Sequence, residues 1–64
     1  MKYNVLAVSA VGGFTILQGT MAYLPRIGEE IEVDMIVYKI KNIRHIIKEG
    51  TQTIADVILY LVIV

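Results

Sequence analysis

The sequence predicts an all-β protein, a five-stranded antiparallel small barrel of the SH3-like type, with an OB-like barrel as the alternative. Three observations support this prediction. Segments rich in Val, Ile, Tyr and Thr alternate with turn residues along the chain, which is typical of short strands. No segment of useful length has a helical period. The strand that follows residue 35 changes its alternation partway, as strands do when they bend round the corner of a small barrel.

Length and composition restrict the alternatives. A chain of 64 residues without cysteine forms one domain, near the lower size limit for a core that is stable without disulfides. Six basic residues balance six acidic ones, which argues against a strongly basic nucleic-acid binder or an acidic tail. Residues 3–25 carry no charge, but Gly12-Gly13 and Gln18-Gly19 interrupt this run. We therefore expect neither a membrane span nor a cleaved signal peptide.

The first predicted hairpin has strands near residues 2–11 and 14–24. Gly12 and Gly13 lie between them and suit a two-residue turn, because glycine adopts a positive φ without a steric penalty. One face of this hairpin is expected to carry Leu6, Val8, Ala10, Leu17 and Met21, and the other Tyr3, Val5, Val11, Phe14 and Ile16. Residues 25–28 (PRIG) then form a connection.

The second predicted hairpin turns at Asp34 and Met35, between a strand near residues 29–33 and the long fourth strand. The expected register places Val33 opposite Ile36, Ile31 opposite Tyr38, and Glu30 opposite Lys39. The apolar face then carries Ile31, Val33, Ile36, Tyr38 and Ile40, and the polar face Glu30, Glu32, Lys39 and Lys41. This single register separates apolar from charged residues on both strands at once.

The alternation of the fourth strand changes after Ile40, since the next apolar positions are Ile43 and Ile47. A bulge near Lys41 and Asn42 would restore the inward face. The last turn is expected at residues 49–52 and the fifth strand at residues 53–64. This strand is apolar on both faces, with Val57, Leu59, Leu61 and Ile63 on one side and Ile58, Tyr60, Val62 and Val64 on the other.

Apolar residues on both faces predict self-association. A domain of this size has one core and hides one face, and an exposed apolar face marks an interaction surface. The predicted oligomer interface consists of Val57, Ile58, Leu59, Tyr60, Leu61 and Val62. The expected partner is a second copy of the chain, with another protein as the alternative. A barrel that closes more completely would cover both faces, and this interpretation competes with self-association.

The sequence offers few candidates for chemistry. It contains one Ser, Ser9, and one His, so no nucleophile with its base is expected, and we predict neither an enzyme nor a cofactor. Glu30, Glu32 and Asp34 alternate along one strand, but such positions lie about 6.6 Å apart, too far for a compact oxygen cage. We therefore expect a solvated acidic face and no metal site.

His45 and Asp56 form a candidate polar pair. A four-residue last turn would place them opposite each other, which could create a pH-sensitive contact. A three-residue turn would instead place Arg44 opposite Asp56. An ordinary cross-strand contact of the histidine is the alternative to a functional role.

Four basic residues suggest an alternative function. Lys39, Lys41, Arg44 and Lys48 are candidates for the outer face of the bent strand, and small barrels bind nucleic acid through basic grooves with aromatic platforms. Glu30 and Glu32 lie beside Lys39 in the expected register and partly neutralise it. A charge-balanced surface is therefore favoured, and nucleic acid is not the expected partner.

Residues 24–45 (LPRIGEEIEVDMIVYKIKNIRH) resemble a pattern in small bacterial and phage proteins of unknown function. The pattern is Leu-Pro-x-apolar-Gly-acidic, a short hairpin, then Tyr-x-apolar and a His. Met35 stands where such sequences commonly have Gly at the hairpin tip. The resemblance implies a turn that leads into a hairpin and implies no activity. The sequence as a whole predicts a non-enzymatic structural or protein-interaction module, with a nucleic-acid-binding small barrel as the alternative.

Overall fold

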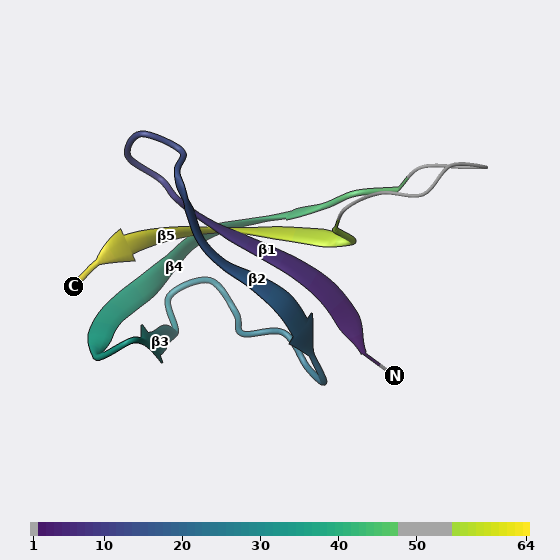
Figure 1. Ribbon diagram of the computed structural model, residues 1–64, viewed down its shortest axis with the longest axis horizontal. Coiled ribbons are helices and arrows are strands. Elements are labelled where there is room, and N and C mark those ends of the chain that lie inside the picture. The colour runs from purple at the N-terminus through teal and green to yellow at the C-terminus, as the bar shows by residue number, and fades with distance from the viewer. Residues whose placement is uncertain (1, 48–54) are drawn as a thin grey trace.

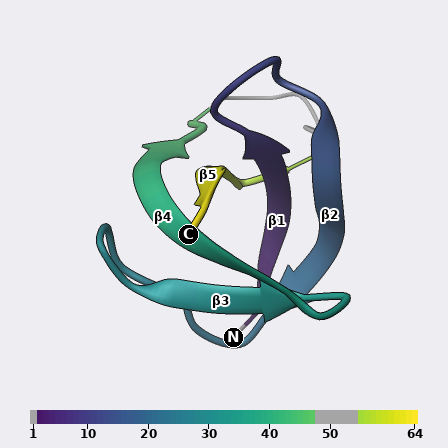
Figure 2. The same cartoon turned by 90° about the vertical axis from the view of Figure 1, so that its left-hand side faces the viewer.

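The computed structural model describes residues 2–47 and 55–64. These residues form five strands: β1 (Tyr3–Ser9), β2 (Thr15–Met21), β3 (Glu30–Val33), β4 (Ile36–His45) and β5 (Val57–Ile63). The strands make one sheet in the order β2-β1-β5-β4-β3, which curls into a half-barrel (Figures 1 and 2). The predicted all-β, five-stranded, barrel-like fold is confirmed. Within the described part of the chain, no helix has the length and hydropathy needed to cross a membrane.

The centre of the sheet differs from the expected antiparallel arrangement. β1 and β5 lie side by side and run parallel, from Val5 opposite Val57 to Ser9 opposite Leu61. The other three neighbouring pairs are antiparallel. A parallel pair requires a long crossover connection, and here the segment between the two strands includes β2, β3 and β4. Turn signals between consecutive strands do not reveal such a pair.

The β3–β4 hairpin has the predicted register, with Val33 opposite Ile36 and Glu30 opposite Lys39. Its turn residues, Asp34 and Met35, have φ values of 51° and 68°. Both values are positive, as the type I′ turn of a two-residue hairpin requires. Asp tolerates this conformation, whereas Met adopts it at a steric cost.

β4 contains the predicted bulge. Its pairing with β5 shifts between Ile40, opposite Leu61, and Asn42, opposite Tyr60. Lys41 is the extra residue. After the shift, Ile43 packs against the core as expected. Ile47 does not, because it lies beyond the end of β4 and is 92% exposed.

The first hairpin does not have the predicted two-residue turn. The Ser9 N–H donates to the Phe14 carbonyl at 2.8 Å, and the Gly13 N–H donates to the Ser9 carbonyl at 3.1 Å. The loop therefore comprises residues 10–13. The Ser9 hydroxyl accepts from the Val11 N–H and donates to the Val11 carbonyl. This local side-chain turn stabilises a longer loop than the two glycines alone suggest.

A bulge in β2 changes which residues of the first hairpin share a face. Ala7 pairs with Leu17 and Tyr3 with Met21, and the register shifts between Ala7 and Val8. Leu17 and Met21 therefore lie on the inner face of the sheet. The expectation that they share a face with Leu6 and Val8 was wrong, because Ile16 is an extra residue in β2 at this shift and reverses the faces of the residues that follow it.

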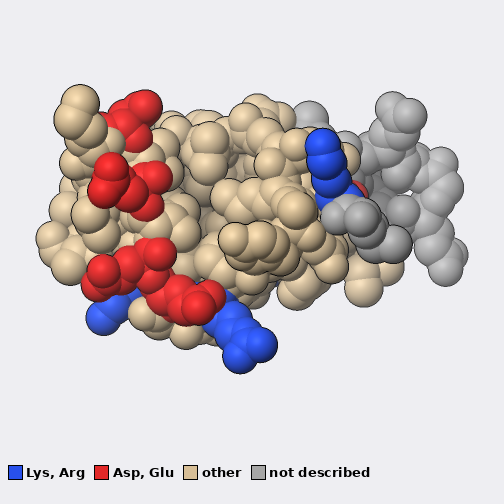
Figure 3. All heavy atoms as spheres, turned by 90° about the horizontal axis from the view of Figure 1, so that it is seen from below, with Lys and Arg blue, Asp and Glu red and all other residues tan. Residues whose placement is uncertain are grey.

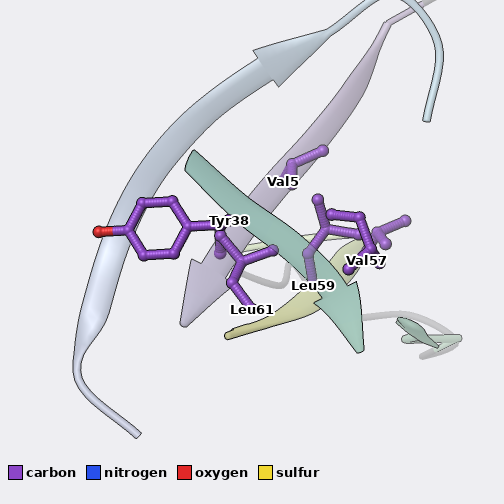
Figure 4. Close-up of a cluster of buried hydrophobic side chains, with 7 residues drawn as sticks. Val5, Tyr38, Val57, Leu59 and Leu61 are labelled. Carbon is purple, nitrogen blue, oxygen red and sulfur yellow. The ribbon is translucent and has the colours of Figure 1, made fainter. Parts of the chain in front are cut away.

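The core occupies the inner face of the half-barrel, between β1, β4 and β5 (Figure 4). Its fully packed members are Val5, Ala7, Tyr38, Ile40, Val57, Leu59 and Leu61. Partly buried apolar residues surround them: Tyr3, Ile16, Leu17, Met21, Leu24, Ile31, Val33 and Ile43. Among the described residues, no polar or charged residue is buried. The core is therefore entirely apolar apart from the hydroxyl group of Tyr38.

Candidate interaction surface

The outer face of the two central strands is apolar. In the parallel ladder, Leu6 lies beside Ile58 and Val8 beside Tyr60, and residues paired in this way share a face. Val62 continues the same face of β5. We call these five residues the outer strip. Val8 is 9% exposed and the other four are partly buried. The described strands form a single sheet, so none of them covers the strip as a second layer.

A polar and partly basic border lies along one side of the outer strip. On β4, Lys39 lies opposite Val62, Asn42 opposite Tyr60, and Arg44 opposite Ile58. The Arg44 guanidinium carbon is 5.6 Å from the centre of the Tyr60 ring. A cation–π contact of this kind contributes about 0.5–1 kcal/mol at an exposed site. The structure thus places an aromatic ring beside the basic residues.

Further apolar residues extend the outer strip to one end of the molecule. The Val64 N–H donates to the Val37 carbonyl at 3.2 Å, and these two residues are 68% and 37% exposed. The tip of the first hairpin, the β3–β4 turn and the C-terminus all lie at this end (Figure 1). Other exposed apolar residues of these segments are Val11, Phe14, Met35, Ile36 and Ile63.

The structure divides the predicted oligomer interface into two halves. Val57, Leu59 and Leu61 are at most 1% exposed, because they form the core of their own chain. Their assignment to an interface was wrong. Ile58, Tyr60 and Val62 lie on the opposite face of β5, in the outer strip, where a partner could reach them. The sequence alone does not link Leu6 and Val8 to this surface, since only the parallel pairing of β1 with β5 brings them there.

Neither register expected for Asp56 is observed. His45 lies opposite Val57 and Arg44 opposite Ile58. The Asp56 carbonyl instead accepts from the Ile46 N–H at 2.9 Å. The Asp56 N–H donates to the Asn4 carbonyl at 2.8 Å, and its carboxylate accepts from the Asn4 N–H at 3.2 Å. Asp56 therefore joins the start of β5 to β1, and the predicted direct pair with His45 does not form.

The last predicted turn, at residues 49–52, lies outside the described residues, as do Lys48 and residues 53–54 of the predicted last strand. Of the other candidate basic residues, Lys39 and Arg44 lie on the outer face and Lys41 is exposed at the bulge. Glu30 lies opposite Lys39, as predicted. The basic border is therefore partly neutralised at its β3 end.

Acidic residues gather at the β3 end of the molecule (Figure 3). They are Glu29, Glu30, Glu32 and Asp34. Within residues 2–47 and 55–64, no group of three or more His, Asp or Glu side chains is placed to hold a metal ion. The acidic cluster is an exposed charged surface at the β3 edge.

A hollow of about 1080 Å³ lies between the end of β2, the connection that follows it, and β3. It is lined by Met21, Ala22, Tyr23, Leu24, Pro25, Arg26, Glu29, Glu30 and Ile31. The connection turns at Gly28, whose φ is 92°. The Glu29 N–H donates to the Arg26 carbonyl at 3.0 Å, and the Glu29 carboxylate accepts from the Arg26 N–H. Glu29 thus stabilises the turn.

The described residues define a class of protein, a small all-β half-barrel with a partly exposed apolar outer strip beside a basic border. Comparison of the chain with protein-family models, with curated proteins and with solved structures finds no match. The surface of the molecule is therefore what bears on function, and the outer strip is an extended apolar feature of that surface.

Proposed function

We propose that this protein is a non-enzymatic interaction module that self-associates, with two copies packing their outer strips against each other. The observation that supports this proposal is the apolar outer face of β1 and β5 in a sheet of a single layer. β1 and β5 run parallel, and sheets of parallel strands normally have both faces covered. A contiguous apolar patch on such a face marks an interaction site.

A second copy suits the charge distribution of this surface. The outer strip carries no charge, and its basic border lies only on the β4 side. A two-fold axis that runs along β5 would place β4 of each copy over β1 of the other. This arrangement keeps Lys39 and Arg44 of the two copies apart. Each partly buried Leu, Ile or Val that the contact covers would contribute roughly 1 kcal/mol.

The experiment that tests the proposal compares two Ile→Glu variants. Ile58→Glu introduces a charge into the outer strip, and Arg44 lies opposite to accept it, so the isolated copy is expected to fold. Ile47→Glu makes the same change at a residue that is 92% exposed and outside the strands. Light scattering after size exclusion should give a lower mass for Ile58→Glu than for the wild type, and an unchanged mass for Ile47→Glu.

Two results would contradict this proposal. One is a wild-type protein that remains a monomer over the whole accessible concentration range. The other is an Ile58→Glu variant that folds, as circular dichroism would show, and keeps the wild-type mass. The first excludes self-association altogether, and the second excludes the outer strip as the contact.

The second candidate function is nucleic-acid binding through the β4 border. The contact between Arg44 and Tyr60 favours it, since basic residues beside an aromatic ring are the elements of single-strand binding surfaces. Retention on an oligonucleotide column should then fall steeply with salt. Replacing Lys39 and Arg44 by Gln should reduce the salt dependence by about one unit of slope for each bound phosphate that the change removes. Retention unaffected by this double change would exclude the β4 border.

A further inference from the structure

The two edge strands of the sheet differ in their protection against pairing. An edge strand presents unpaired N–H and C=O groups, and proteins usually shield them with charges, proline or a short strand. β3 has four residues, of which Glu30 and Glu32 are charged. β2 lies at the other edge and has seven residues (TILQGTM), with no charge and no proline. Among the described strands, β2 therefore has the edge that is open to another strand.

The structure of a single chain gives no reason for a glycine at position 19 of β2. Gly19 is not among the residues with positive φ, and a Cβ atom built on it would meet no atom of the described residues within 4 Å. Neither the backbone conformation nor crowding requires glycine at this position. Glycine inside a strand weakens it, and often marks a place where another backbone or a ligand approaches closely.

A second copy of β2 is complementary to this strand. In an antiparallel pair centred on Gln18, each Gln18 faces the other, and Leu17 of each copy faces Gly19 of the other. Leu17 and Gly19 both lie on the inner face of the sheet, since they pair with Ala7 and Val5. Each partly buried Leu17 side chain would then lie over the open space at Gly19 of the second copy. The large side chain of Leu17 in each copy thus faces the glycine of the other copy across the two-fold axis.

We propose that β2 pairs edge to edge with β2 of a second copy, antiparallel about Gln18, so that two half-barrels share one continuous sheet. This inference rests on the proposed self-association and adds a contact separate from the outer strip. Pairing through β3 would instead bring Glu30 and Glu32 of two copies together, and like charges in facing strands destabilise the pair. Two different isologous contacts on one chain build a closed tetramer when their two-fold axes intersect at right angles.

The test uses opposite charges at the two-fold axis. Gln18→Lys alone and Gln18→Glu alone should each raise the dissociation constant of the β2–β2 contact about fivefold, because like charges then face each other. An equimolar mixture of the two variants should recover wild-type affinity, because a Lys then faces a Glu.

Thr20→Lys and Thr20→Glu are the matched controls on the same strand. Position 20 faces Ile16 of the second copy, so mixing these two variants should recover nothing. Sedimentation equilibrium measures all of these constants.

Gly19→Val separates association from folding. Valine favours a strand, and the space at Gly19 accepts its side chain. At a concentration where the protein is monomeric, this variant should melt at a higher temperature than the wild type. It should nevertheless associate more weakly, because valine occupies the space that receives Leu17. A change that merely damaged the fold would lower both the melting temperature and the affinity of association.

Each outcome supports or overturns a defined claim. Edge pairing is overturned if Gln18→Lys and Gln18→Glu keep the wild-type dissociation constant, or if their mixture recovers no affinity. If Ile58→Glu still lowers the mass in that case, the proposed self-association through the outer strip stands and only the pairing of β2 is excluded. A wild-type protein that is monomeric throughout overturns both proposals.

Discussion

Individual backbone conformations determine how this small fold turns its corners. Asp34 and Met35 both have positive φ, and the side chain of Met35 is 91% exposed. Met35 therefore gains little from packing while its backbone is held in a conformation that disfavours a Cβ atom. The tip of the β3–β4 hairpin is strained at this residue.

Replacing Met35 with Gly should stabilise the protein. Glycine adopts the left-handed conformation without a steric penalty, and Asp-Gly is a preferred sequence for a type I′ turn. We expect the free energy of unfolding, measured with urea, to rise by about 0.5–1 kcal/mol after allowance for the flexibility of glycine in the unfolded chain. Met35→Ala is the control, because alanine keeps the Cβ atom. Equal stability of the two variants would show that the turn is not strained.

The core residues of β5 should be the most sensitive to truncation. Leu59 is 0% exposed, and removal of such a side chain costs about 2–5 kcal/mol. A domain of this size rarely has more than about 3–5 kcal/mol of stability. Leu59→Ala should therefore be largely unfolded at 25 °C by circular dichroism. Ile63→Ala, on the same strand at a position 70% exposed, should differ from the wild type by less than about 0.5 kcal/mol.

At the scale of the elements, two hairpins with similar turn signals have different loops. Asp34-Met35 makes a two-residue turn without glycine, whereas Gly12-Gly13 belongs to a loop of residues 10–13. The hydroxyl of Ser9 explains the difference, because it binds the backbone of Val11 and stabilises the longer loop. A polar side chain before the glycines thus stabilises the loop, and the bulge at Ile16 sets the register of the rest of β2.

The contribution of Ser9 is measurable. Ser9→Ala removes both hydrogen bonds to Val11, and the free energy of unfolding should fall by about 0.5–1.5 kcal/mol. Ser9→Thr retains the hydroxyl group and should lose less. Chemical denaturation of the three proteins provides the comparison. Wild-type stability in Ser9→Ala would mean that the glycines alone determine the loop.

At the scale of the whole molecule, the described strands form a single curled layer with the core on the inside. β2 and β3 are the edges of the sheet and do not pair with each other, so the barrel is open between them. Core residues near this opening, such as Leu17 and Ile31, are only partly buried. The apolar outer strip lies on the other face. Two further copies could cover the outer strip and the β2 edge at the same time, since they are different surfaces.

Association through apolar contacts should depend on concentration and hardly on salt. We expect light scattering to give a multiple of 7.2 kDa at high concentration, with nearly the same mass at low and high ionic strength, because screening affects charges and not apolar surface. The melting temperature should rise with protein concentration by mass action. A mass that falls steeply with added salt would point to charge pairing between copies instead.

Much of the local structure could be predicted from the sequence. The register of the β3–β4 hairpin follows from alternation on two strands joined by a short turn, and the bulge at Lys41 follows from the change in that alternation. The candidate interface was predicted only in part. Both faces of β5 are apolar, so the sequence could not distinguish Leu59, in the core, from Tyr60, in the outer strip. The resemblance of residues 24–45 to small bacterial and phage proteins stays a prediction.

The sequence by itself determined the strands, one hairpin register and the position of the bend, because alternation and turn chemistry act between near neighbours. Only the tertiary structure decided the parallel pairing of β1 with β5, and with it the partners of Asp56 and the composition of the outer strip. The contact between Asn4 and Asp56, at the start of this pairing, joins residues 52 positions apart in the chain. Such contacts depend on how the whole sheet closes over its core, and no local pattern encodes them.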